Sequence, residues 1–552
     1  MQPKIQAGVF ALLAGGQCAL LAEARGELPG LRAVSPSRRV HCFLGKRNVF
    51  ECELLLDLFQ TNGFRVTFSP GEGAALDAEE IFHLANFLDG IRAHYERDDA
   101  RRKFYRRWRD ELLSAGRSDP RPPDVTLPRA RRPLPPLRAL LRQIFQPGAA
   151  AQESARIGQA FAAGRTAALA GRARGERLLI SGWYGTETLG DKAILGGVIA
   201  AARRVRPGLA IDVASLEPYV SRMTARQMPD LGIERILSPS EARAAVAAGE
   251  YDTVAVGGGP LMSPIPWCTH LLELFADAKK AGAKTIVAGC GVGPLFVEHR
   301  NAAIKYLLEL ADEVILRDQA SADRARCELG VARACAVALD PAFVWIQRHL
   351  PAAIERDPRQ ILLAVRDWPI EEFAAGMKRA HAEKLKAHYE AELLRMIREL
   401  LRLDPTLHIV PFCMHKYAVG GDDRVFYRRL LTNFPEILAR LDHRHRTPME
   451  DLQTISRSRV VLAMRFHSVV FSLATRTPFL AVDYTLGGKT AGLLDDVGAG
   501  DRLVPIECFD GLDAAKRLLA AGDFAADLSA RINDTESILE QAFARIWAPP
   551  AP

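Results

Sequence analysis

The sequence predicts an α/β protein built from two successive domains with mostly parallel sheets. From residue 177 onward, short apolar runs alternate with segments of helix length, and a second alternation of the same kind begins at residue 361. Strands separated by such helices form βαβ units, which give parallel sheets with right-handed crossovers. The prolines and charges of Pro351–Arg359 are typical of a hinge. We expect domains at 151–355 and 356–552, with a cleft between them.

The composition is that of a folded globular protein. The 552 residues are 48% hydrophobic and 25% charged, with a net charge of +7, and they suffice for two or three full-sized cores. The nine cysteines are scattered without CxxC spacing, which argues against a disulfide framework and against a metal site. The apolar stretch 8–22 is too short and too rich in glycine to span a membrane. We expect a cytoplasmic location, with membrane association left open.

The first alternation predicts six strands and the helices between them. The helices include Glu241–Ala248 and Leu271–Ala281, and a further helix within 152–173 leads into the domain. The expected strands are Leu178–Ser181, Ala210–Ala214, Thr253–Val256, Thr285–Ala288, Val314–Leu316 and Ala334–Leu339.

The second alternation predicts a similar domain. Apolar, partly β-branched runs indicate buried parallel strands, and longer amphipathic runs indicate helices. The expected strands are Ile361–Val365, His408–Phe412, Val460–Met464, Phe479–Val482 and Leu503–Ile506. The expected helices are Phe373–Leu403, Asp422–Leu441, Met449–Ser456, Ser468–Ala474 and Ala525–Trp547.

Residues 1–150 have a different character. Val40–Leu44, Phe50–Phe59 and Phe64–Phe68 read as one β–α–β unit. A basic helical stretch and a proline-rich linker follow, and much of the net positive charge lies in the segment 92–142. Its mixture of arginine and aromatic residues fits a solvated helix face, nucleic acid or anionic lipid. We predict peripheral contact with an anionic membrane through this segment, and no nucleic-acid partner.

Glycines cluster at three predicted strand ends of the first domain. Gly185, Gly190 and Asp191 lie around the first strand-to-helix turn, Gly258 and Gly259 follow the strand Thr253–Val256, and Gly291 follows Thr285–Ala288. Glycine lets the backbone approach a ligand closely, and a helix amino end binds anions. Tight turns alone would also explain each cluster. Because all three lie at the same sheet edge, we favour loops that bind phosphate or an acceptor.

Three polar residues lie at strand ends of the second domain. Arg366 follows its first strand, and Arg465 and His467 follow the strand Val460–Met464. Open α/β sheets place ligands at the carboxyl ends of their strands. Two arginines converging there suit a ligand with carboxylate and phosphate groups, and a nearby imidazole exchanges protons near neutral pH. These residues predict transfer chemistry on an anionic small molecule, although a surface cation and an idle histidine would explain the pair Arg465 and His467 alone.

The chain resembles the polysaccharide pyruvyl transferase family from about residue 177 to 520. The matching strings, in family order, are YGTETLGDKAIL, AVGGGPLM, GAKTIVAGCGVGPL, EVILRDQASADRARCELGV, LDPAF, AVRDW and RSRVVLAMRFHSVVFSLATRTPFLAVDY, followed by Lys489. Nothing before about residue 150 carries the resemblance. It implies two Rossmann-like parallel-sheet domains in a GT-B-like arrangement, with an extra N-terminal α/β and helical region.

The resemblance also implies a reaction. Members transfer the enolpyruvyl unit of phosphoenolpyruvate to saccharide hydroxyls, which gives a pyruvate ketal on a cell-surface polysaccharide. His467 and Arg465 match the Arg-x-His element and are the expected catalytic residues. Arg366, Arg465 and Lys489 are expected to bind the donor. Phosphoenolpyruvate is a co-substrate, so we expect no cofactor and no metal, and the acceptor is a saccharide for which attachment to a lipid is left open.

One position departs from the family pattern. The family usually has asparagine two residues before the Gly-Asp of its first loop, where this chain has Thr188. Threonine lacks the amide donors of asparagine, so we expect the ligand contacts at this loop to differ from those of the family. Two alternatives therefore stay open: a GT-B-like glycosyltransferase that uses a sugar nucleotide, and a non-catalytic saccharide-binding relative.

Overall fold

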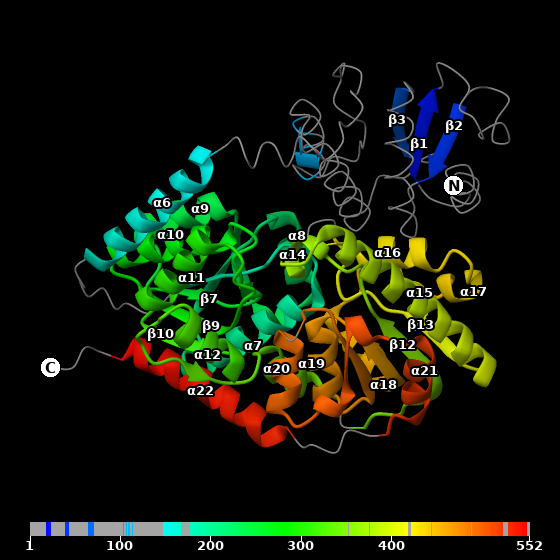
Figure 1. Cartoon of the computed structure of the whole chain (residues 1–552). Helices are drawn as coiled ribbons and strands as arrows, with labels where there is room; N and C mark the ends of the chain where they lie inside the picture. The colour runs from blue at the N-terminus through cyan, green and yellow to red at the C-terminus, as the bar shows by residue number, and fades with distance from the viewer. Residues whose placement is uncertain are drawn as a thin grey trace. The chain divides into compact units, whose positions relative to one another are not determined.

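A computed structural model describes residues 147–166 and 177–548, apart from 352, 375, 418–420, 443, 487 and 523–527. It also describes three strands between residues 18 and 70 and six helical positions between 103 and 113. The chain divides into two compact units. One comprises Met1–Phe145, Lys416–Val425 and Asp442–His445, and the other comprises the rest of the chain (Figure 1).

The smaller unit contains a three-stranded antiparallel sheet. β2 (Arg39–Phe43) and β3 (Arg65–Pro70) lie at the two predicted strand positions, and both pair with β1 (Cys18–Glu23) between them. The strand β1 was not predicted. The expected helix Phe50–Phe59 and most of the basic segment 92–142 lie outside the described residues.

The first large sheet has eight parallel strands in the order β11-β10-β9-β7-β4-β5-β6, with β8 paired to β9. All six predicted strands are present, although β11 is shorter than expected, and β6 and β8 were not predicted. The strands are β4 (Arg177–Ser181), β5 (Ala210–Ala214), β6 (Ile233–Leu237), β7 (Thr253–Val256), β8 (Pro260–Leu261), β9 (Lys284–Val292), β10 (Glu313–Leu316) and β11 (Ala336–Val337).

Helices between these strands bury their apolar faces against the sheet. The helix α9 begins with a capping box in which Ser238 and Glu241 satisfy each other's backbone N–H groups, as the pattern Ser-x-x-Glu predicts. The helices are α6 (Pro147–Thr166), α7 (Leu189–Val205), α8 (Pro218–Gln227), α9 (Pro239–Ala247), α10 (Trp267–Lys280), α11 (Glu298–Leu310), α12 (Gln319–Asp323) and α13 (Ala342–His349).

The second large sheet has five parallel strands in the order β13-β12-β14-β15-β16. The five predicted strands are confirmed, and the two Rossmann-like parallel-sheet domains are therefore both present. The strands are β12 (Asp357–Ala364), β13 (His408–Pro411), β14 (Ser458–Ala463), β15 (Phe479–Asp483) and β16 (Leu503–Pro505).

Two predicted helices of this domain differ from the expectation. The helix expected at Phe373–Leu403 begins only at Arg379, after a separate short helix that ends at Phe373. The expected helix Asp422–Leu441 forms two shorter helices, because Pro435 has no backbone N–H and disfavours the helical conformation at Phe434, whose φ is −129°. The helices are α14 (Ile370–Phe373), α15 (Arg379–Leu403), α16 (Asp423–Leu430), α17 (Pro435–Leu438), α18 (Pro448–Arg457), α19 (Phe466–Ala474), α20 (Lys489–Asp496) and α21 (Gly511–Ala520).

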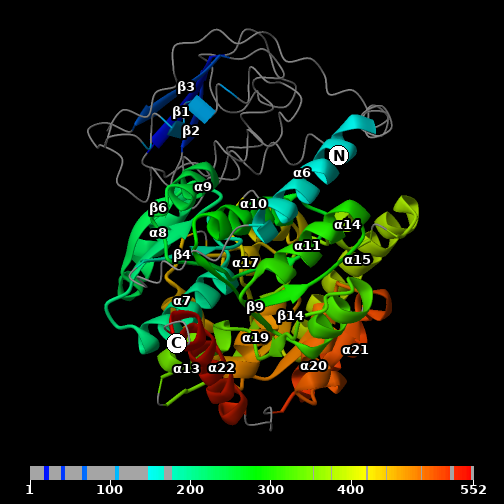
Figure 2. The ribbon, with the colours of Figure 1, turned by 90° about the vertical axis from the view of Figure 1, so that its left-hand side faces the viewer.

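The two sheets share part of one core. Buried residues of α7 and α13, such as Ile194 and Trp345, belong to the same apolar cluster as Phe471 of α19. The last helix, α22 (Ser529–Trp547), follows the second sheet but packs on α7 and α13 of the first domain (Figures 1 and 2). Its Trp547 Nε1 donates a hydrogen bond of 2.9 Å to Thr253 Oγ1 in β7.

Candidate functional site

Three basic residues gather at the carboxyl edge of the second sheet. Arg366 follows β12 and Arg465 follows β14, and both are buried. Lys489 begins α20. Arg366 Cζ lies 5.6 Å and Lys489 Nζ lies 5.7 Å from the ring centroid of Tyr484, which follows β15. Because β12, β14 and β15 are neighbours, the structure brings the predicted donor-binding residues together around one tyrosine.

The positive charges at this sheet edge lower the pKa of Tyr484. Its side chain is buried, and burial by itself raises a phenol's pKa. The positive charges of Lys489, Arg366 and Arg465 outweigh that effect, so the pKa of Tyr484 falls below its ordinary value. The same charges favour any anion that enters this edge.

Phe466, the middle residue of the Arg-x-His element, contacts cations from both domains. Arg317 directly follows β10 of the first sheet, and its Cζ atom lies 4.1 Å from the centroid of the Phe466 ring. Lys489 Nζ, from the second domain, lies 5.7 Å from the same centroid. Both contacts are within range of cation–π attraction. The second-domain element is therefore packed against a first-domain arginine.

His467 lies against the amino end of α7. A Cβ atom added to Gly190 would fall 2.0 Å from Cγ and Nδ1 of the His467 ring, so only glycine fits there. This contact brings the predicted acid/base of the second domain next to Asp191, the neighbour of Gly190 in the first turn of α7. The predicted residues of the two domains therefore meet here.

Asp191 has an unusual protonation equilibrium. Burial raises the pKa of its carboxyl to about 6, with a contribution from the charge of Asp340, while His467, Lys489 and Arg317 act in the opposite direction. Its Oδ1 atom is buried and has no hydrogen-bond partner among the described residues. A carboxyl that titrates near neutral pH is suited to accept and release protons.

Asp340 lies between β11 and α13 and is 1% exposed. Its Oδ2 atom lies 3.5 Å from His467 Nε2 and 3.3 Å from Arg317 Nη1, and its Oδ1 atom accepts a hydrogen bond of 3.0 Å from Ala342 N. Burial acts to raise the pKa of Asp340, but these three partners together lower it below the ordinary value. Asp340 is therefore an ionised carboxylate that faces both His467 and Arg317.

Thr188 connects the two domains at the same loop. Its Oγ1 atom lies 2.9 Å from His415 Nδ1, in the chain beyond β13, and the two residues form an isolated antiparallel β-bridge. Leu189 N donates a hydrogen bond of 3.0 Å to Met414 O. The threonine side chain that replaces the family asparagine thus contributes to contact between the domains.

The remaining predicted loop residues pack against first-domain groups. Cβ atoms added to these glycines would fall within 3 Å of Tyr184 for Gly258, Trp183 for Gly259, Arg317 for Gly291 and Ser215 for Gly185. Gly185, Gly258 and Gly259 have positive φ. Close packing thus accounts for these glycines. Gly291 reaches the site through Arg317, whereas no described contact joins Gly185 or Gly259 to His467.

Sequence reasoning overlooked three residues of the cluster. Arg317 follows β10, Asp340 follows β11 and Tyr484 follows β15. Each position carries the strand-end signal that singled out Arg366 and Arg465, so the same criterion applied to every strand would have found them.

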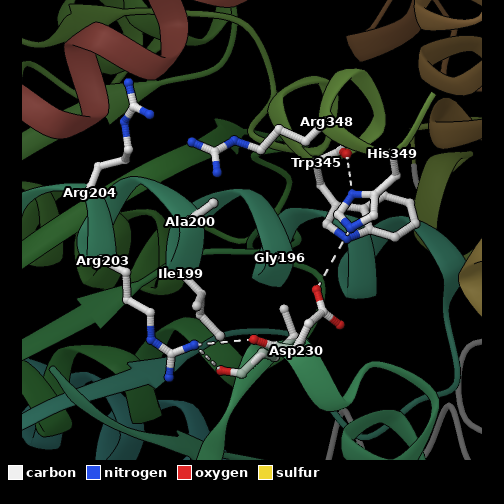
Figure 3. Close-up of a pocket in the computed structure, with 10 residues that line it drawn as sticks. Gly196, Ile199, Ala200, Arg203, Arg204, Asp230, Trp345, Arg348 and His349 are labelled. Carbon is white, nitrogen blue, oxygen red and sulfur yellow. Dashed lines mark hydrogen bonds and ion pairs between the residues drawn. The ribbon is translucent and has the colours of Figure 1, made fainter. Parts of the chain in front are cut away.

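A separate pocket of about 550 Å³ lies between α7, α13 and the turn Pro229–Leu231 (Figure 3). Its basic side chains have partners within the protein. Arg203 donates to backbone carbonyls, Arg204 and Arg348 pair with glutamates of α22, and His349 Nε2 lies 3.7 Å from an oxygen of Asp230. None of the predicted site residues lines this pocket.

Among the residues that the structure describes, no helix combines the length and apolar character needed to cross a bilayer. Also within that part of the chain, histidine, cysteine and acidic side chains form no group of three placed to hold a metal ion.

Comparison with known sequences gives one family match. Residues 93–485 match the family described as polysaccharide pyruvyl transferase. This match confirms the family predicted from the sequence. It extends into the segment before residue 150, where no resemblance was expected, and it ends before Lys489. No curated protein sequence matches the chain.

Solved structures with similar folds are distant. A UDP-GlcNAc 2-epimerase from Methanocaldococcus jannaschii is 10% identical and covers 66% of this chain and 98% of its own, with a TM-score of 0.43. A UDP-GlcNAc 2-epimerase from Neisseria meningitidis bound to UDP-GlcNAc is 12% identical over 67% and 98%, with a TM-score of 0.42. An E. coli heptosyltransferase with ADP is 14% identical over 62% and 99%, with a TM-score of 0.33. Similarities this low support no conclusion about function.

Proposed function

Because the chain belongs to the polysaccharide pyruvyl transferase family, we propose that it transfers the enolpyruvyl unit of phosphoenolpyruvate to saccharide hydroxyls and forms a pyruvate ketal. The observation that carries this proposal is the convergence of Arg366, Arg465 and Lys489 around Tyr484, beside His467. Phosphoenolpyruvate is the co-substrate, and the proposed reaction needs no cofactor.

The basic residues suit the donor's charge. Phosphoenolpyruvate carries a carboxylate and a phosphate on one carbon. Arg366 and Arg465 offer planar guanidinium groups for bidentate contacts, while Lys489 offers a compact charge. The burial of Arg366 and Arg465 strengthens their attraction for the donor, because water screens it less.

His467 would supply the first proton. Protonation of the donor's methylene carbon leaves an oxocarbenium carbon, and a saccharide hydroxyl attacks that carbon. Phosphate then leaves with the C–O electron pair, and a second hydroxyl closes the ketal. The two hydroxyl protons balance the proton taken up by the methyl group and the proton carried away by phosphate, so one diol and one donor give one ketal and one hydrogen phosphate.

Asp191 is suited to the acceptor side of this reaction. It lies in the first turn of α7 in the first domain, next to the glycine that contacts His467, and its carboxyl has a pKa of about 6. Near neutral pH it can take a proton from an attacking hydroxyl and pass it on. In this scheme the second domain activates the donor and the first domain activates the acceptor.

The test is phosphate release from phosphoenolpyruvate in the presence of saccharide acceptors, together with mass detection of the ketal. We expect release that depends on the acceptor and disappears in His467→Ala. Phosphate release that is independent of an acceptor, or unaffected by His467→Ala, would contradict the proposal.

Thermal stabilisation separates the proposal from the glycosyltransferase alternative. Phosphoenolpyruvate should raise the melting temperature, and UDP- and GDP-sugars should not. The reverse pattern would favour a sugar-nucleotide donor. Stabilisation by saccharides alone, with no turnover of either donor, would favour a non-catalytic binding protein.

A further inference from the structure

We infer that Asp340 of the first domain is a positioning residue for His467 of the second domain, and that Arg317 holds Asp340 in place. This inference rests on the proposed function, in which His467 carries a proton. The strand-end pattern marks the positions of Asp340 and Arg317, but neither that pattern nor the family match gives them a role.

The geometry places one carboxylate between two groups. The Oδ2 atom of Asp340 lies 3.5 Å from His467 Nε2 and 3.3 Å from Arg317 Nη1. The other carboxyl oxygen, Oδ1, accepts a hydrogen bond from Ala342 N at the start of α13. Because the backbone holds one oxygen and Arg317 holds the other, the orientation of the carboxylate toward the imidazole is fixed.

The imidazole is also confined on its opposite flank. Gly190 lies directly against Cγ and Nδ1 of the ring, so the ring is held between α7 on one side and Asp340 on the other. Its Nε2 atom is buried and has no hydrogen bond within geometric limits among the described residues. At 3.5 Å, a small movement of either domain is enough to make or break a hydrogen bond to Asp340.

Other charges face this pair and affect its protonation. Asp191 comes from α7, Lys489 from α20, and Arg465 directly precedes the helix that carries His467. Asp318 lies beside Arg317, with Oδ2 3.7 Å from Arg317 Nε, but its Oδ1 atom caps Ser321 N at 2.6 Å. Of the three carboxylates Asp191, Asp318 and Asp340, only Asp340 lies within ion-pair distance of His467 in the part of the chain that the structure describes.

A purely structural role is the competing explanation, and the chain contains a matched example. Asp212 in β5 is also fully buried, and it binds Arg177, Arg235 and Tyr251 at distances of 2.7 to 2.9 Å. No histidine is among those described partners. Asp340 therefore resembles Asp212 in burial and arginine pairing and differs from it in facing His467.

The experiment compares Asp340→Asn with Asp212→Asn. Asparagine keeps the size of the side chain and removes the charge that favours a protonated imidazole. We expect Asp340→Asn to lower kcat by about 10- to 100-fold, by analogy with the loss of a carboxylate that orients a metal-binding histidine. The KM for phosphoenolpyruvate should change little. Asp212→Asn should lower stability and leave the pH dependence of kcat unchanged.

A second measurement needs no turnover. In protein with 13C-labelled histidine, the ring signal of His467 is identified by its loss in His467→Gln. We expect the chemical shift of this signal to change in Asp340→Asn, because the ring loses the carboxylate that faces its Nε2 atom, and to be unmoved in Asp212→Asn. An unmoved signal in Asp340→Asn, or equal kcat losses in the two variants, would overturn the inference. Failure of the proposed reaction would instead appear as absent turnover in the unchanged protein.

Discussion

Gly190 and His467 come from different domains and lie in direct contact, so that the missing side chain of one makes room for the imidazole of the other. We predict that Gly190→Ala folds and lowers kcat by at least about 100-fold, because an error near 1 Å in a catalytic group has that effect. The measurement is the steady-state rate with saturating donor. Gly158→Ala is the control, since a methyl group added to that helical glycine would have no atom within 4 Å and should leave full activity.

The raised pKa of Asp191 predicts that stability depends on pH. The folded state holds this proton more tightly than the unfolded chain, so stability is lost as the pH rises from the ordinary value of 3.8 through about 6. Asp191→Asn resembles the neutral acid. The variant should be more stable than the unchanged protein at pH 8, by at most about 3 kcal/mol, and equally stable at pH 4. Urea unfolding at both pH values measures this.

An exposed carboxyl provides the control for that experiment. Asp534 lies on the solvent side of α22, and Asp534→Asn removes one negative charge without a burial effect. Its stability difference should be small and should not grow between pH 4 and pH 8. A stability gain in Asp191→Asn that is the same at both pH values would show that burial of the charge is not its cause.

Donor binding is predicted to depend on Arg366 and not on the pocket beside α13. Arg366→Gln removes a buried guanidinium from the cluster around Tyr484, and we expect the KM for phosphoenolpyruvate to rise at least about 10-fold. Arg204→Gln, in the pocket of Figure 3, is the control and should leave this KM unchanged. A rise in KM for Arg204→Gln with no rise for Arg366→Gln would show that the donor binds in that pocket instead.

The contact of Thr188 with His415 predicts an energetic link between the domains. Thr188→Val removes the hydrogen bond of 2.9 Å and should lower the free energy of unfolding by about 1 kcal/mol. A double-mutant cycle with His415→Gln isolates the pair, and we expect a coupling of about 0.5 to 1.5 kcal/mol. Additive losses would mean that the two side chains contribute independently.

The basic segment 92–142 is predicted to dock on anionic membranes. Replacing Arg101, Arg102, Arg106 and Arg107 with glutamine should weaken binding to vesicles that contain anionic lipid, since each charge contributes about 1 kcal/mol near such a surface. Turnover of a soluble acceptor should not change. Sedimentation with anionic and neutral vesicles measures the effect, and equal binding by both proteins would refute the prediction.

Much of the fold was predictable because parallel strands have a clear local signal. The runs at Ile361–Val365 and Val460–Met464 are apolar and partly β-branched, and the residues that follow them lie at one sheet edge for topological reasons. Strand order and polarity are therefore enough to bring Arg366 near Arg465. Pro435 is also a local signal, and it marks the break between α16 and α17. One continuous helix was predicted there because the amphipathic pattern continues on both sides of the proline.

The cluster around His467 was less predictable, because its partners lie in another domain. Asp340 and His467 are separated by more than a hundred residues, and no periodicity encodes how two domains meet. Gly190 illustrates the difficulty, since it was interpreted as a residue that admits a ligand, whereas it also admits the His467 ring.

The return of α22 to the first domain gives the two sheet domains a second connection. The chain passes from the first sheet to the second near Pro351–Arg359, and it passes back between α21 and α22. Movement of one domain relative to the other would displace His467 from Asp340 and Gly190 at the same time. The packing of α22 on the first domain and the apolar core that both sheets share oppose such movement, so they help to keep the imidazole against both residues.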